Sequence, residues 1–269
     1  MRLLKRPEEI RELQSLYAAP RFWDGRYLTF WFETDADVLR ALLPPPLEPT
    51  GESLATAWIG QVGDSDCVGG FLGAALFLRA RYGDIEGNYC LAMPMSTAEA
   101  VIFGRELYGE PKKLATVSFQ VRDDEVSGQV ERRGAVFMRF RATLGEEMPV
   151  GRRRTRIFHF KFLPRPDGQG FDHPPLLVLV HSDFDTRLIR HARGEISLLD
   201  SPYDPVADLP VRRVTQATYA EGDIYTRGEV LCQVDPEAFL PYAFAKMDDL
   251  RLTVREAEER RSALHRWGR

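Results

Sequence analysis

The sequence predicts an α+β fold made mainly of antiparallel β-strands, arranged as a sheet or barrel with flanking helices. Segments with alternating apolar residues follow one another through much of the chain, and few helical patterns separate them. The composition does not change along the chain, and no internal repeat or low-complexity segment occurs. We therefore expect a single domain over residues 1–269, with peripheral helices at about 8–18 and 249–267.

The first third of the chain contains three predicted strands and one helix. Residues 26–32 are rich in strand-forming side chains, and residues 34–43 form a helix pattern that ends at a run of prolines. Residues 53–62 and 71–82 are the next strands. The second of these is apolar on both faces, which predicts a central, buried strand.

A helix is predicted between a strand at 89–95 and Gly109. Ser96 and Glu99 have the spacing of a capping box, and the helix pattern continues to Tyr108. Gly109 suits the left-handed position that ends a helix. The apolar stripe is wide, so we expect the helix to be buried on more than one side, with Arg105 and Glu106 in need of partners.

Alternating patterns return from residue 114 onward. They predict strands over 114–121, 126–132, 136–144, 158–162 and 176–180, further strands over 187–234, and a helix over 236–246. Such a succession of strands is typical of an antiparallel sheet or barrel.

The composition excludes several classes of function. Apolar residues make up 44% of the chain and charged residues 28%, as in ordinary globular proteins, and the net charge of −4 argues against a nucleic-acid surface. No apolar run is long enough to span a bilayer, and the first residues do not resemble a secretory signal. Three scattered cysteines fit a reduced compartment, so we expect a cytoplasmic protein.

Two polar clusters have alternative interpretations. His181, Asp183 and Asp185 would share a strand face and could bind a metal, although a plain polar face or a hydrogen-bonded turn is the simpler interpretation. The basic run over residues 152–156 is interpreted as a solvated loop or a subunit contact in preference to an anion site. The cysteines and histidines lack zinc-site spacing, and no phosphate-loop or nucleophile-elbow motif occurs.

The consecutive lysines Lys112 and Lys113 form the most specific candidate site. Adjacent ammonium groups repel each other, and an apolar environment disfavours the charged form, so both effects would lower a lysine pKa. A neutral amine can attack a ketone and form a Schiff base. The alternative interpretation is that the two lysines begin a strand and lie in water.

The stretch from Gly104 to Leu114 closely resembles the acetoacetate decarboxylase superfamily. Further landmarks occur in the same order as in that family: Arg26-Tyr27, Thr34-Asp35-Ala36-Asp37 with Leu39-Arg40, Pro46-Leu47-Glu48, Lys161-Phe162-Leu163-Pro164 with Asp167-Gly168, and Asp208-Leu209-Pro210-Val211. The resemblance covers about residues 20–245. It implies an acetoacetate decarboxylase-like β cone or barrel, a homo-oligomer of four or more subunits, and no metal or organic cofactor.

The resemblance also implies roles for individual residues. Lys112 would form the Schiff base, Lys113 would help to lower its pKa, and Arg26 would contact the substrate carboxylate. The iminium would then stabilise a carbanion formed by loss of CO₂, by proton abstraction or by cleavage of a carbon–carbon bond. Acetoacetate decarboxylase is itself a standard example of a lysine activated by a neighbouring cation, so this general rule adds no independent support for the assignment.

The sequence departs from the family pattern where two glutamates should face the substrate carboxylate. Trp58 and Gly73 lie near those positions, and neither is acidic. This favours aldolase, dehydratase or hydratase chemistry on a small 2-oxo acid over decarboxylation of a β-keto acid. Glu110 is the leading candidate for a proton shuttle, with Tyr82, Tyr225 and Tyr242 as alternatives. Residues expected to contact the substrate are Arg26, Glu106, Tyr82, Met93 and Tyr242.

An interpretation of a different class remains open on the sequence alone. The chain could be a binding protein that keeps the pocket but has no turnover, and Lys112 would then behave as an ordinary lysine. Trapping of a covalent adduct on Lys112 with a small oxo acid distinguishes this interpretation from the enzyme.

Overall fold

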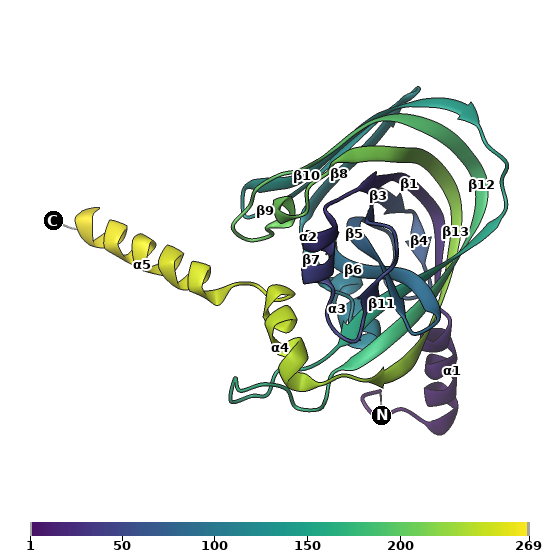
Figure 1. The fold of residues 1–269 in the computed structure, drawn as a ribbon. Helices are drawn as coiled ribbons and strands as arrows, with labels where there is room; N and C mark the ends of the chain where they lie inside the picture. Colours follow the sequence, from purple (N-terminus) through teal and green to yellow (C-terminus); the bar gives the residue numbers. More distant parts are fainter. Residues whose placement is uncertain (1, 268–269) are drawn as a thin grey trace.

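The computed structural model describes residues 2–267, and most of this chain is β-strand (Figure 1). The helices are α1 (Pro7–Ala18), α2 (Ala36–Leu42), α3 (Ala98–Tyr108), α4 (Pro236–Ala245), α5 (Leu250–Trp267) and the short 3₁₀ helix η1 (Val206–Asp208). The strands are β1 (Arg21–Glu33), β2 (Glu48–Pro49), β3 (Leu54–Val62), β4 (Asp64–Ser65), β5 (Phe71–Tyr82), β6 (Ile85–Met95), β7 (Lys112–Leu114), β8 (Thr116–Arg122), β9 (Glu125–Arg132), β10 (Ala135–Glu147), β11 (Arg152–Lys161), β12 (Leu176–Leu198) and β13 (Arg213–Gln233).

Part of the sheet closes on itself into a barrel. The strand order β11-β6-β5-β3-β1-β13-β12 becomes a ring because β11 also pairs with β12. Neighbours in this ring are antiparallel except β6 and β11, which are parallel and meet where Asn88 lies opposite Ile157. Strands β10, β9 and β8 continue the sheet beyond β12 and curve over the ring (Figure 1).

The strands of the ring have two different buried faces. In β1, Leu28, Phe30 and Phe32 are fully buried in the main core, which strand β10 completes with residues such as Phe140. The alternate residues Tyr27, Thr29 and Trp31 line a cavity inside the ring instead. Successive side chains of a strand point to opposite faces, so one strand supplies both the core and the cavity wall.

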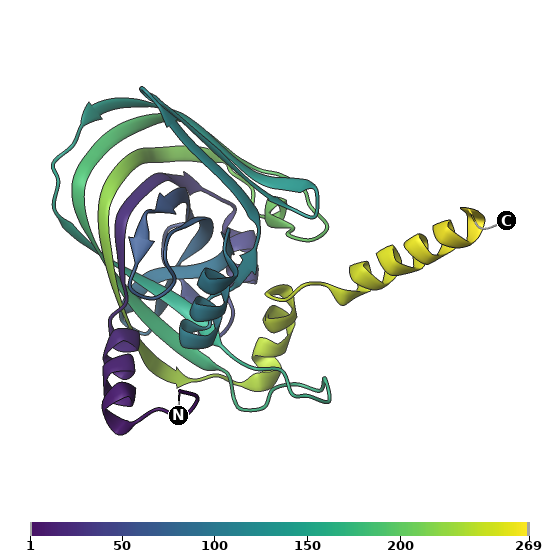
Figure 2. The same cartoon turned by 180° about the vertical axis from the view of Figure 1, so that it is seen from behind.

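The helices are peripheral except α3, which packs against β6, β7 and β11. Helix α1 lies on the outside of the barrel, and α5 projects away from it, as the views from both sides show (Figures 1 and 2). Near its start, α5 contacts the body through Glu256, which pairs with Arg133 and accepts a hydrogen bond from Tyr203. The α+β class and the barrel architecture are therefore confirmed.

Several local predictions are confirmed. Strand β5 spans the predicted residues and is buried over most of its length, and α3 ends at Gly109 in the left-handed conformation with φ 74°. The cap at the other end of α3 differs from the prediction. Thr97 caps the helix by accepting a hydrogen bond from the Ala100 amide, while the Ser96 hydroxyl accepts one from the Leu72 amide on β5.

Three sequence predictions are corrected. The basic run is not a loop but the first half of β11, and residues 176–198 form one continuous strand rather than several. Helix α3 is buried on one side only, through Ala100, Gly104 and Tyr108, whereas Arg105 and Glu106 are exposed. The broad apolar pattern of α3 includes half-exposed residues that lie at the rim of the core, which explains the difference.

Among the described residues, no helix is long and apolar enough to cross a membrane. The three cysteines are free. The described part of the chain also holds no cluster of three or more potential metal ligands. Two of the three candidate ligands on β12 have protein partners, because Asp183 binds Arg152 and Arg154 while His181 contacts Glu229.

Candidate active site

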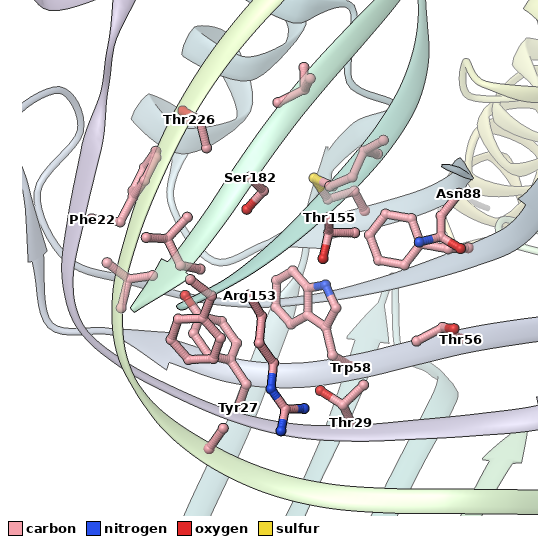
Figure 3. A pocket seen from close by; sticks show the side chains of 18 of the residues that line it. Phe22, Tyr27, Thr29, Thr56, Trp58, Asn88, Arg153, Thr155, Ser182 and Thr226 are labelled. Carbon is pink, nitrogen blue, oxygen red and sulfur yellow. The ribbon is translucent and has the colours of Figure 1, made fainter. Parts of the chain in front are cut away.

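The interior of the ring contains a cavity of about 300 Å³. Its wall is mostly apolar and aromatic, with hydroxyl groups from several threonines and Ser182 (Figure 3). Three of the described residues that line it have acidic or basic side chains: Glu110, Lys112 and Arg153. An apolar cavity with a few convergent polar groups is the usual form of a small-molecule site.

Lys112 is 7% exposed and forms an ion pair inside this cavity. Its ammonium nitrogen lies 2.7 Å from Oε2 of Glu110, whose side chain is 12% exposed. The sequence analysis predicted Lys112 as the nucleophile and Glu110 as a proton shuttle, and the structure brings these two groups into contact. Both also share the cavity with Met93, the predicted apolar wall residue.

The end of helix α3 sets the geometry of this pair. Gly109 turns the chain out of the helix, and the amide of Glu110 donates a hydrogen bond to the carbonyl of Gly104. Strand β7 then adds to β6, with Lys112 opposite Met93. The guanidinium of Arg105 holds the carbonyl of Lys112 at 3.1 Å. Hydrogen bonds to the backbone of both Glu110 and Lys112 thus fix the end of α3 relative to the start of β7.

Gly104 leaves the space that the pair occupies. A Cβ atom at this position would lie 2.6 Å from the Lys112 nitrogen and would overlap with Oε2 of Glu110. Real side chains do not tolerate such approaches, so any other residue at position 104 would displace one of the two charged groups. The glycine is required here for close approach and not for an unusual backbone angle.

Electrostatics keep Glu110 ionised despite its burial. Burial acts to raise the pKa of Glu110, but the charge of the Lys112 ammonium and the hydrogen bond from Lys112 outweigh it, so the pKa lies below its usual value. His159 is fully buried. Burial is the main cause that lowers the pKa of His159 to about 4, so this imidazole is neutral at pH 7.

Lys113 points to the opposite side of β7. Its nitrogen lies 3.2 Å from Asp204 and 3.5 Å from Asp248, and the same two aspartates bind Arg132. The two neighbouring ammonium groups therefore have separate surroundings, because consecutive side chains of a strand diverge. That Lys113 lowers the pKa of Lys112 stays a prediction. Any such effect would act at a distance, because the two side chains are not in contact.

The other predicted contact residues lie away from the described cavity lining. Arg26 is 53% exposed and faces Glu221 at 3.8 Å. Glu106 is on the exposed face of α3. Tyr82 and Tyr242 are half-buried and pack against the main core. None of these four residues is thus brought together with Lys112, and Tyr225, a further shuttle candidate, also lies outside the lining.

Sequence reasoning missed an aromatic wall. Tyr27 contacts Trp58 and Phe184 edge-on, with ring centroids 5.3 and 5.5 Å apart. Trp58 lies on β3, and its indole lines the cavity beside Tyr27. Strand alternation was the available signal, but it does not reveal which face of a strand is enclosed and which is packed.

The two positions where the family pattern has glutamates belong to this wall or lie beside it. Trp58 lines the cavity, and Gly73 lies opposite Met95, whose side chain also lines it. A Cβ atom on Gly73 would lie 2.7 Å from the sulfur of Met95, so the methionine occupies the space next to this glycine. The predicted loss of the two carboxylates thus corresponds to an apolar surface.

A second buried lysine was also missed. Lys246, which follows α4, is 5% exposed, and its nitrogen lies over the ring of Tyr89 at 4.7 Å and that of Phe160 at 5.7 Å. Burial is the main cause that lowers the pKa of Lys246 to about 8. It lies outside the described lining of the Lys112 cavity. It is a single lysine at the end of an apolar helix, and no motif in the sequence indicates its burial.

Comparisons with known proteins agree with this architecture. The model of the family "Acetoacetate decarboxylase (ADC)" matches residues 7–234. An acetoacetate decarboxylase of Burkholderia multivorans is 30% identical over 214 residues, which are 76% of this chain and 84% of the relative. One of Burkholderia cenocepacia is 30% identical over 213 residues, with the same coverage of both chains.

Solved structures show the same fold at lower identity. The acetoacetate decarboxylase of Legionella pneumophila has a TM-score of 0.71 and 22% identity, over 80% of this chain and 87% of that one. The enduracididine biosynthesis enzyme MppR, in complex with pyruvate, has a TM-score of 0.68 and 16% identity, over 80% of this chain and 91% of that one. With the family match over most of its length, this chain belongs to the acetoacetate decarboxylase family.

Proposed function

We propose that the protein is a Schiff-base enzyme that acts on an oxo acid, with Lys112 as the nucleophile and Glu110 as the proton carrier. The observation that supports this most directly is the pair itself. A buried amine lies 2.7 Å from the one carboxylate found among the described cavity-lining residues. Nucleophile and base within hydrogen-bond reach are the signature of covalent catalysis.

The pair accounts for every proton in iminium formation. The Lys112 ammonium passes a proton to Glu110, and the resulting amine adds to the carbonyl carbon. Glu110 then returns the proton as the former carbonyl oxygen leaves as water. Two of the three ammonium hydrogens leave in that water, one stays on the iminium nitrogen, and the positive charge and the Glu110 carboxylate are both restored.

The iminium makes the neighbouring carbon acidic, and Glu110 is again a carboxylate at that point. It would remove a proton from this carbon and generate an enamine. An enamine can add to an aldehyde or eliminate water, which is aldolase or dehydratase chemistry, and hydration is its reverse. The apolar surface of Trp58 and Met95 supports this preference, because no carboxylate among the described lining residues is placed there to act on a departing CO₂.

Decarboxylation of a β-keto acid is the second candidate function. The curated relatives at 30% identity are acetoacetate decarboxylases, and they favour this alternative. Loss of CO₂ needs the same iminium as an electron sink. In decarboxylation the electrons that enter the iminium come from a carbon–carbon bond, whereas in aldolase or dehydratase chemistry they come from a carbon–hydrogen bond.

Two measurements separate these possibilities. Sodium borohydride reduction in the presence of pyruvate or acetoacetate should leave a stable adduct on Lys112, identified by mass spectrometry. Nuclear magnetic resonance in D₂O should then show exchange of the pyruvate methyl protons by the wild-type protein. Rapid CO₂ release from acetoacetate without such exchange would replace the first candidate with the second. If no oxo acid of any chain length is trapped on Lys112, the enzyme proposal fails and the protein is better described as a binding protein.

A further inference from the structure

One charge in the cavity lining has no counterpart. Glu110 and Lys112 neutralise each other, and this remains true when the amine becomes an iminium. Arg153 is the third charged group of the described lining. Among the described side chains, no ion pair or hydrogen bond involves its guanidinium, whereas its neighbours Arg152 and Arg154 both bind Asp183.

Strand alternation explains why these three arginines differ. Arg152 and Arg154 share the outer face of β11 with the partner carboxylate on β12. Arg153 is on the other face, opposite Phe184, and lines the cavity together with Thr155 and Ile157. Figure 3 shows its guanidinium among the lining side chains that include Tyr27, Trp58 and Thr29.

Arg153 and Lys112 lie at different ends of the cavity. Lys112 pairs with Met93 of β6, and Ile157 pairs with Asn88 on the same edge of that strand. Arg153 is thus nine strand positions away from Lys112, or about 30 Å of strand path before tilt and curvature shorten the direct distance. Lys112 is 7% exposed, whereas Arg153 is exposed to solvent, so the arginine marks the open end.

We propose that Arg153 binds an anionic group of the substrate that is remote from the reacting carbonyl. The proposal rests on the proposed Schiff base at Lys112 and narrows its substrate to oxo acids with an apolar spacer between carbonyl and carboxylate. A carboxylate bonded directly to the carbonyl carbon cannot reach both ends of the cavity. The aromatic rings of Tyr27, Trp58 and Phe184 suit the spacer, and a guanidinium binds a carboxylate through two parallel hydrogen bonds.

The test is borohydride trapping with a series of methyl ketones of increasing length. The acids are 4-oxopentanoate, 8-oxononanoate and 12-oxotridecanoate, each compared with the uncharged ketone of equal chain length. We expect the wild-type protein to prefer the acid over its neutral counterpart, with a preference that grows with length and reaches roughly tenfold or more, as one charge-assisted contact can provide. Half-saturating concentrations for adduct formation measure this preference.

Variants of single arginines provide the controls. Arg153→Gln should abolish the preference for the long acid and leave trapping of the neutral ketone unchanged. Arg156→Gln removes the same charge from an exposed position on the same strand. This control should change neither the preference for the long acid nor the trapping of the neutral ketone. The proposal is overturned if Arg153→Gln keeps the preference, if Arg26→Gln removes it instead, or if the shortest acid is preferred.

A direct binding measurement separates failure of this proposal from failure of the proposed function. Octanoate has no carbonyl that could react with Lys112, and calorimetry should show that it binds to the wild-type protein and binds at least tenfold more weakly to Arg153→Gln. Absence of any trapped ketone together with Arg153-dependent octanoate binding would overturn the Schiff base alone. Trapping of ketones without any effect of Arg153 on either readout would overturn the anion site alone.

Discussion

Lys112 and Lys113 are consecutive residues of the three-residue strand β7, yet their side chains meet different surroundings. Lys112 lies in the cavity with a single carboxylate for a partner. Lys113 lies on the other side among Asp204, Asp248 and Arg132. One side of the strand thus holds a minimal ion pair next to open space, whereas the other holds a network of several charges.

This difference shows how one short strand can combine a reactive group with an anchor. A network of charges restrains each member through several partners, so Lys113 holds β7 against the segments that precede η1 and α5. A single pair next to a cavity can exchange its proton and its partner when a ligand enters. Chemistry is therefore expected on the side with fewer contacts, and stability on the side with more.

The largest expected effect comes from truncating each lysine in turn. Lys112→Ala should abolish adduct formation with oxo acids, because it removes the amine itself. Lys113→Ala should keep the adduct and lower the free energy of unfolding by about 1 kcal/mol, since a partly buried member of a charge network is lost. Mass spectrometry after borohydride reduction and urea denaturation measure the two effects. A changed pH profile of trapping in Lys113→Ala would support the role that the family resemblance implies for this residue.

A smaller but still severe effect is expected at Gly104. Gly104→Ala would stabilise an unstrained helix by about 1 kcal/mol, but its methyl group would displace Glu110 or Lys112. We expect the rate of adduct formation to fall by roughly tenfold to a hundredfold, because small misplacements of reacting groups are costly. Gly51→Ala, where a Cβ atom meets no other atom within 4 Å, is the matched control. An unchanged trapping rate in Gly104→Ala would show that the pair can move without loss of function.

The charged side of β7 should matter for stability more than for chemistry. Asp204 is 9% exposed and binds both Arg132 and Lys113. Asp204→Asn should lower the free energy of unfolding by roughly 2–4 kcal/mol, because it leaves a buried arginine with one carboxylate fewer. Adduct formation at Lys112 should change little. Urea denaturation and borohydride trapping on the same samples check this, and a large loss of trapping with normal stability would refute the division between the two sides.

An effect that appears only below neutral pH is a difference in acid sensitivity between the two sides of β7. The unfolded chain protonates His159 near pH 6.5, whereas the folded protein does so only near pH 4, so the unfolded state binds more protons in between. Stability should therefore fall as the pH is lowered from 6.5 toward 4, by on the order of 3 kcal/mol in total from this group.

His159→Phe should remove that part of the pH dependence, which denaturation at pH 4.5 and pH 7.5 would measure. On the other side of β7, burial opposes ionisation of Asp248, but Arg132 and Lys113 lower its pKa. The stability from Asp248 is therefore present above pH 4 and is lost only below it. Equal acid sensitivity of the wild type and His159→Phe between pH 4 and 6.5 would contradict this assignment.

Much of the fold was predictable because it depends on local patterns. The alternation in β5, the helix α3 and the glycine after it are visible in neighbouring residues. The 23-residue strand β12 was not predicted as one element, because its polar stretch from His181 onward resembles a turn when its partners are unknown. Those partners are β10, β11 and β13, and the residues of β12 alone do not show which strands pair with it.

The candidate site was predictable only in part. The lysine and its neighbouring glutamate lie two residues apart, so one motif contains both. Arg153 was not predicted, because it belongs to a run of arginines whose members differ only in the face of the strand that they occupy. Which face is enclosed depends on ring closure between β11, β12 and β6, which no local pattern encodes.

The pairing of β1 with β13 has a consequence for the order in which the protein becomes active. Glu110 and Lys112 are neighbours in sequence and can meet when their own segment folds. Strand β1 can complete the barrel only after β13 has been made, since Arg21 pairs with Tyr225. Contacts between such distant parts of a chain form slowly. During synthesis, Lys112 would therefore remain an ordinary accessible lysine until the last strands emerge, and reactivity toward carbonyl compounds would begin only when the barrel closes.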